Sequence, residues 1–194
     1  MPPERVALLL AAGFSRRYGS DKRLAGSPPL ILRTLAPLLS YHDHVLVVLR
    51  RDDEALRRLL ADCGAELTQV PLDGGLGDSL AHGVRTLLAS GRPVHSLTIA
   101  LADMPHLSSA SLRALQAAQS GLEIVRPLHL GQPGHPVSFP ADLLPELASL
   151  SGEQGAQSIV ARHQARLRCL PLNDPGCVQD IDWPGDPLWP SDPL

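Results

Sequence analysis

Residues 6–22 read V-A-L-L-L-A-A-G-F-S-R-R-Y-G-S-D-K, an apolar run that opens directly into a glycine-bearing loop. The apolar run predicts a buried strand, and the small residues at its end let a ligand approach the main chain. Gly13 can adopt a positive φ and leave successive N–H groups free to bind an anion. The stretch therefore predicts the first strand of an α/β fold, with a phosphate-binding loop at its carboxyl end.

The loop ends at Lys22, the one lysine among 17 basic residues. Because arginine is used everywhere else, a compact and flexible ammonium is expected to be needed at this position. Arg16 and Arg17 add charge that suits a polyphosphate, since a guanidinium can bind two oxygens at once. The stretch fits neither G-x-x-x-x-G-K-[ST] nor G-x-G-x-x-G, so we expect a different kind of phosphate loop.

Strand-like and helix-like segments alternate along the rest of the chain. We expect strands at 6–10, 44–49, 66–70, 96–100, 124–128, 136–139 and 166–171, and helices at 31–39, 54–63, 79–89, 108–119, 143–150 and 156–163. Asp52 or Asp53, Ser79 and Ser108 are the expected N-caps of the second, third and fourth helices. Alternation of this kind indicates a Rossmann-like three-layer α/β/α sandwich with a mainly parallel sheet.

Composition narrows the class of protein. A chain of 194 residues is long enough for one such domain, expected at 1–188, with a C-terminal tail at 189–194. A net charge of −3 without a basic stripe argues against a nucleic-acid partner. The longest apolar stretch is too short for a bilayer, and three cysteines without C-x-x-C spacing indicate neither disulfides nor zinc. We expect a cytoplasmic enzyme that binds no membrane.

Three aspartates are candidates for a metal site. Asp103 directly follows the apolar run 97–101, where a carboxylate can ligate a hard cation that bridges phosphates, or can form a turn before Met104. Asp180 and Asp182 lie two residues apart, so their side chains would point the same way on an extended segment. Mg²⁺ is the natural ion for such a carboxylate set.

Five motifs in one order resemble the MobA-like nucleotidyltransferases, which include the molybdenum cofactor cytidylyltransferases and guanylyltransferases. The first is L-A-x-G-x-x-x-R-x-G-x-x-K at 10–22, and the second is G-G-L-G-D-S-L-A-H-G at 74–83. L-A-D-M-P at 101–105, G-Q-P-G-H-P at 131–136 and D-I-D-W-P at 180–184 follow. The resemblance covers nearly the whole chain, and its last two motifs are most similar to the cytidylyltransferase branch.

The resemblance implies roles for the positions that match. The implied nucleotide-binding residues are Leu10, Ala11, Ala12, Gly13, Arg16, Gly74, Gly75 and Ser79. The implied catalytic residues are Arg17, Lys22 and Asp103, and the implied acceptor-binding residues are Gly134 and His135. His135 is equally well interpreted as a turn histidine with local partners. The implied Mg²⁺ ligands are Asp103, Asp182 and Asp180, with Asp182 preferred to Asp180 as the second carboxylate.

The implied reaction is transfer of CMP from CTP to a phosphorylated acceptor, molybdopterin or the molybdenum cofactor, with release of pyrophosphate. CTP is preferred to GTP because the cytidylyltransferase branch usually reads L-A-A-G, and this chain has Ala12 at the deciding position. A molybdoenzyme or its maturation chaperone is the implied protein partner. The alternatives are guanylyl or other nucleotidyl transfer to a different acceptor, such as a sugar phosphate, and a non-catalytic maturation protein that binds the cofactor and hands it on.

The chain departs from the family pattern on the acceptor side. The family's G-D-x-G-A-R appears here as G-E-Q-G-A-Q at 152–157, so an arginine that could touch the acceptor is missing. Trp183 stands where the closing motif usually has threonine. The motifs therefore predict the nucleotide half of the site more firmly than the acceptor half.

Overall fold

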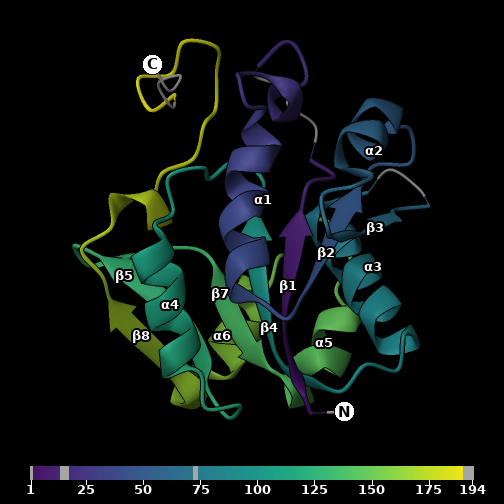
Figure 1. Cartoon of the computed structure of the whole chain (residues 1–194). Helices are drawn as coiled ribbons and strands as arrows, with labels where there is room; N and C mark the ends of the chain where they lie inside the picture. The colour runs from purple at the N-terminus through teal and green to yellow at the C-terminus, as the bar shows by residue number, and fades with distance from the viewer. Residues whose placement is uncertain (1, 14–17, 72–73, 190–194) are drawn as a thin grey trace.

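A computed structural model describes residues 2–13, 18–71 and 74–189 (Figure 1). Within these residues the strands form one eight-stranded sheet, in the order β3-β2-β1-β4-β7-β5-β6, and β8 pairs with β5. The strands are β1 (Glu4–Leu10), β2 (His44–Leu49), β3 (Glu66–Gln69), β4 (Val94–Leu101), β5 (Ile124–His129), β6 (Gln132–Pro133), β7 (Val137–Pro140) and β8 (Leu167–Pro171). Each predicted strand is confirmed, and the short β6 was not predicted.

The central strands run parallel. β1 lies between β2 and β4 and pairs in parallel with both, and β2–β3 and β5–β8 are also parallel pairs. β7 reverses direction against β4 and β5, and β6 forms an antiparallel hairpin with β5. The sheet is therefore mainly parallel, as predicted, and the carboxyl ends of β1, β2 and β4 meet at one edge.

Helices cover both faces of this sheet (Figure 1). One face packs on α1 (Leu30–Tyr41), α2 (Glu54–Leu60) and α4 (Ser109–Ala118), and the other on α3 (Leu76–Ala89), α5 (Leu144–Ala148) and α6 (Gln157–Arg162). The reason is the alternation of side chains in β1, because Val6, Leu8 and Leu10 face one layer while Ala7 and Leu9 face the other. No helix in the described ranges has the length and apolar character to cross a bilayer.

The predicted N-caps have different outcomes. Ser108 caps α4, since its side chain accepts a hydrogen bond from the N–H of Ser111. Asp53 occupies the N-cap position of α2, but its carboxylate binds Arg23 and Arg50 instead of the helix.

The prediction for Ser79 is wrong, because α3 begins earlier than its apolar pattern suggests. Gly75 is the N-cap, and Asp78 accepts its N–H at 2.9 Å. Ser79 therefore lies inside the helix, where its hydroxyl donates to the Gly75 carbonyl. The helices predicted at 54–63 and 143–150 are also shorter than expected, and residues 141–143 form a 3₁₀ turn.

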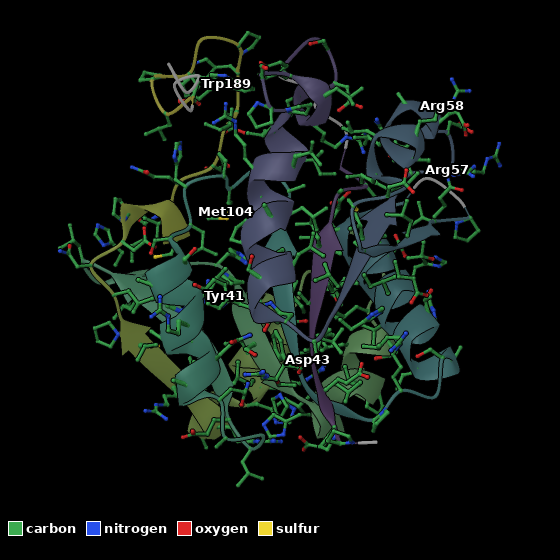
Figure 2. The ribbon with its side chains drawn as sticks, viewed as in Figure 1. Tyr41, Asp43, Arg57, Arg58, Met104 and Trp189 are labelled. Carbon is green, nitrogen blue, oxygen red and sulfur yellow. The ribbon has the colours of Figure 1, made fainter. Side chains whose placement is uncertain are left out.

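Burial of His42 makes the fold sensitive to acid. His42 is 9% exposed, its Nδ1 bonds the Leu38 carbonyl, and burial lowers the pKa of the ring; its neighbours Tyr41 and Asp43 are labelled in Figure 2. Because the unfolded chain takes up this proton more readily, the free energy of unfolding should fall as the pH drops below about 6.5. Urea unfolding between pH 5 and pH 8 should show less of this fall in His42→Asn than in wild type. An equal dependence of the free energy of unfolding on pH in the two proteins would contradict a role for His42.

Candidate active site

A cavity of about 420 Å³ opens at the edge where the parallel strands end. Its lining is Leu10, Ala11, Ala12, Gly13, Lys22, Arg23, Gly74, Gly75, Leu76, Ser79, Leu101, Ala102, Asp103 and Glu153. Two of these strand ends are joined directly, since Ala102 donates its N–H to the Leu10 carbonyl at 3.2 Å. The topology thus brings the end of β1, the end of β4 and the start of α3 to one cavity, which is the usual ligand position in open α/β sheets.

Lys22 is the cationic centre of this cavity. Its Nζ donates to Asp103 Oδ2 at 2.8 Å and to the Ile181 carbonyl at 2.6 Å, and it lies 4.0 Å from Asp182 Oδ1. The sequence separates Lys22 from Asp103 by 81 positions and from Ile181 by 159. The fold therefore gathers residues of the first, third and fifth motifs around one ammonium group.

The carboxylates around Lys22 have the chemistry of a divalent-metal site. Asp103 Oδ1 is buried and has no hydrogen-bond partner among the described residues, so it is an acceptor still in need of a donor or a cation. Burial and the negative charges of Asp103 and Asp182 raise the pKa of Asp180. In the described part of the chain no three His, Cys, Asp or Glu side chains form a ready-made metal cluster. One or two carboxylates that leave room for phosphate oxygens are what Mg²⁺ commonly uses.

The cavity wall formed by the start of α3 depends on small residues. A Cβ added to Gly75 would lie 2.1 Å from the Gly152 carbonyl oxygen, and one added to Gly77 would lie 2.4 Å from that of Gln154. The loop between α5 and α6 therefore packs directly on the first turn of α3, and the Gly77 N–H donates to Gly152 O at 2.8 Å. This contact brings Glu153 to the cavity.

The residues predicted for the acceptor lie beside the cavity. His135 and the loop of Gly134 are packed on Cys177, whose carbonyl accepts the His135 N–H at 2.7 Å. The His135 side chain is partly buried, its buried Nδ1 has no hydrogen-bond partner among the described residues, and desolvation and then Arg126 lower the pKa of the ring. His135 borders a separate small void with Thr34 and Leu38. The acceptor role of His135 stays a prediction.

Two residues that line the cavity were not predicted from the sequence, and two predicted residues lie outside the described part of the chain. Arg23 and Glu153 line the cavity, although neither was predicted as a site residue. Glu153 occupies the second position of the G-E-Q-G-A-Q segment at 152–157, so the family pattern could have indicated it, whereas only the fold reveals Arg23. Arg16 and Arg17 lie outside the described residues. Asp182 lies beside Lys22, and Asp180 is close enough to Asp103 and Asp182 to feel their charges, although their segment is not a strand. Their role as metal ligands stays a prediction.

The C-terminal segment returns to the residues on either side of Lys22. The Trp189 and Tyr18 rings have centroids 6.0 Å apart, and a Cβ added to Gly26 would lie 2.9 Å from the Trp189 ring. His106 Nε2 also bonds the Leu188 carbonyl. Figure 2 shows Trp189 beyond the upper end of α1, far from Asp43. Trp189, where the tail was predicted to start, is therefore packed against the domain.

Comparisons with known proteins agree with this architecture. A family model described as the MobA-like NTP transferase domain matches residues 7–167. The structure is similar to Rv0371c from Mycobacterium tuberculosis H37Rv, with 25% identity, a TM-score of 0.79 and coverage of 94% of each chain. It is also similar to Rv0371C in complex with manganese, with 23% identity, a TM-score of 0.72 and coverage of 87% of this chain and 88% of that one.

A third similar structure is a nucleotidyl transferase, Mth528, from Methanothermobacter thermautotroptrophicus. It is 21% identical, with a TM-score of 0.76 and coverage of 93% of this chain and 92% of that one. No curated protein matches the sequence significantly.

Loss of the Tyr18–Trp189 contact should loosen the phosphate loop. Such an aromatic pair contributes about 0.5–1.5 kcal/mol, so Trp189→Ala should weaken nucleotide binding by at most about tenfold. Calorimetric titration with Mg²⁺-nucleotide would measure this, and Leu130→Ala, which removes an exposed side chain elsewhere, serves as the control. Unchanged affinity in Trp189→Ala would show that the C-terminal contact does not support the loop.

Proposed function

This chain belongs to the MobA-like NTP transferase domain family, and from that premise we propose that it transfers a nucleoside monophosphate from an NTP to a phosphorylated small molecule. The observation that carries the proposal is the convergence of Lys22 and Asp103 at the ends of β1 and β4, inside the cavity described above. A cavity of about 420 Å³ with a cation and a carboxylate at its centre suits a nucleotide.

The chemistry needs positioning and charge more than a protein nucleophile. A phosphate oxygen of the acceptor attacks the α-phosphorus in line, the bond from that phosphorus to the bridging oxygen breaks, and pyrophosphate leaves. Lys22 Nζ stabilises the negative charge around the α-phosphate, and its contact with Asp103 holds the ammonium there until substrate arrives. We assign the departing pyrophosphate to Arg17, which lies outside the described residues.

Asp103 and Asp182 are the proposed ligands of Mg²⁺, with Asp180 as the neighbouring carboxylate. The unpartnered Oδ1 of Asp103 supports this choice, and Asp182 lies beside the same ammonium. When bound, a divalent cation supplies positive charge that neutralises phosphate oxygens. A similar protein crystallised with manganese supports a divalent metal.

CTP is the proposed nucleotide, with GTP as the alternative. Ala12 narrows the cavity near the base, which suits a pyrimidine, and Glu153 lines the same cavity next to the start of α3. A carboxylate accepts a hydrogen bond from the exocyclic amine of cytosine or from the N–H groups of guanine, whereas uracil presents a carbonyl there. Ala12 therefore supports a pyrimidine and Glu153 supports an amino-bearing base, and cytosine meets both conditions.

A molybdopterin-type cofactor is the proposed acceptor, because the G-H-P and D-I-D segments resemble the cytidylyltransferase branch. His135 lies beside a separate void, and Gln157 stands where the family has an arginine, so transfer to a sugar phosphate remains the alternative acceptor class.

The first test is acceptor-dependent pyrophosphate release. With Mg²⁺ and a molybdopterin-type cofactor, we expect release with CTP and at least about a hundredfold lower turnover in Lys22→Ala and in Asp103→Ala, because each removes a transition-state charge contact. Arg57→Ala and Asp52→Ala, both on exposed side chains, are the matched controls.

Each other outcome has a defined meaning. Release with GTP alone would replace cytidylyl by guanylyl transfer. Near-normal turnover in both variants would contradict the mechanism. Tight nucleotide binding without release would indicate a carrier or a different acceptor.

Base choice should depend on Glu153. Replacing its carboxylate by an amide that can also donate, in Glu153→Gln, should reduce the preference for CTP over UTP in kcat/KM by about tenfold, the scale of one exposed charge-assisted hydrogen bond. The control is Gln154→Ala, its exposed neighbour in the same loop. An unchanged preference would remove Glu153 from base recognition.

A further inference from the structure

A charged network lies directly behind Lys22. It consists of Asp21, Arg23, Arg50 and Asp53, which we call the Arg23 network. Arg23 is 3% exposed, although it follows Lys22 in the chain and lines the cavity. A buried guanidinium next to the cationic centre of the site needs an explanation.

Every donor of Arg23 is used within the protein. Its Nε and Nη2 donate to the two oxygens of Asp21 at 2.7 and 2.6 Å, and its Nη1 and Nη2 donate to the two oxygens of Asp53 at 2.6 and 2.7 Å. Nη1 also donates to the Ala11 carbonyl. A guanidinium has five N–H donors, so none is left for a phosphate. Arg23 therefore lines the cavity without being free to bind its ligand.

The network joins three parts of the site. Ala11 lies just beyond β1, Arg50 just beyond β2, and Asp21 caps the 3₁₀ turn η1 (Lys22–Leu24) through the N–H of Arg23. Arg50 closes the network, since its Nη2 donates to Asp53 at 2.9 Å and to Asp21 at 3.2 Å. Both chain neighbours of Lys22 are thus tied to the ends of the two strands.

Charge balance keeps the network ionised. Burial by itself would raise the pKa of Asp53, but hydrogen bonds from Arg23 and then Arg50 outweigh it and lower that pKa. Two arginines face two aspartates, so the network adds no net charge to the cavity. A buried ion pair is weak evidence for stability, because well-packed apolar side chains stabilise a fold as well. Because the network lies next to a flexible lysine, its role is to fix the position of that lysine.

We propose that Arg23 is a positioning residue that holds Lys22 over the ends of β1 and β4, so that its ammonium reaches the reacting phosphate. Lysine has a long, flexible side chain, so the position of its ammonium depends on how firmly its backbone is held. The proposal rests on the proposed function, in which Lys22 contacts the α-phosphate. It makes Arg23 act through Lys22 and without contact to the substrate.

A double-mutant cycle tests this dependence. Pyrophosphate release is measured for wild type, Arg23→Met, Lys22→Met and the double variant. Misplacement by about 1 Å costs about a hundredfold, so Arg23→Met should lower kcat by about that factor with a much smaller change in KM. In the Lys22→Met background the same change should lower kcat less than about threefold, because the group being positioned is gone. Additive losses would overturn the proposal.

Two further variants separate positioning from folding. Asp53→Asn weakens the network from a residue outside the cavity lining and should show the same dependence on Lys22. Arg23→Lys keeps the charge but not the fork, so it should not restore kcat. Near-UV circular dichroism below the unfolding transition checks that each variant is folded. Arg5→Met, which breaks the exposed pair with Asp43, is the control with expected normal turnover.

Failure of the proposed function can be distinguished from failure of the positioning role. If wild type releases no pyrophosphate with any nucleotide, the same cycle is read from Mg²⁺-nucleotide affinity. Arg23→Met should then weaken binding only when Lys22 is present. An equal loss of affinity with and without Lys22 would overturn the positioning role, whatever reaction the protein catalyses.

Discussion

Parallel pairing of β1 between β2 and β4 is the constraint on which the site depends. From Val6 to Leu10 its side chains are buried on both faces, and these residues pair with β2 on one side and β4 on the other. The ladder stops after Leu10, where small residues replace the leucines and leave the main chain accessible. Because both neighbours run in the same direction, their ends contribute to the same cavity.

Arg23 and Lys22 have different roles in the electrostatics of this edge of the sheet. All the N–H donors of Arg23 bind fixed carboxylates and a carbonyl, so its charge is neutralised within the protein. Lys22 contacts Asp103 and Ile181 through a single ammonium that can exchange partners. In the proposed function this difference explains the use of lysine at this one position, because a planar fork fixed by several hydrogen bonds would exchange a carboxylate for a phosphate less readily.

Close backbone contacts complete the cavity from a distant part of the chain. Gly75 and Gly77 admit the carbonyls of the loop between α5 and α6 at distances that no side chain allows. Gly134 does the same for the carbonyl of Cys177, 2.2 Å from the position a Cβ would take. These glycines belong to motifs that resemble nucleotidyltransferases, and in this molecule their described contacts are with protein backbone. Part of each motif therefore has a structural role, because its glycines let distant backbone segments pack against the site.

Periodicity and turn chemistry in the sequence by themselves determined the alternating strands and helices and the place of a glycine-bearing loop after the first strand. They also indicated Lys22 and Asp103 as candidates. These features are local, because side-chain alternation and glycine conformations depend on near neighbours. Tertiary structure alone decided that α3 begins at Leu76, that Asp53 binds Arg23 instead of capping α2, and that Glu153 reaches the cavity. Each of these depends on contacts between residues far apart in the chain, whose approach is set by packing and by satisfaction of buried charge.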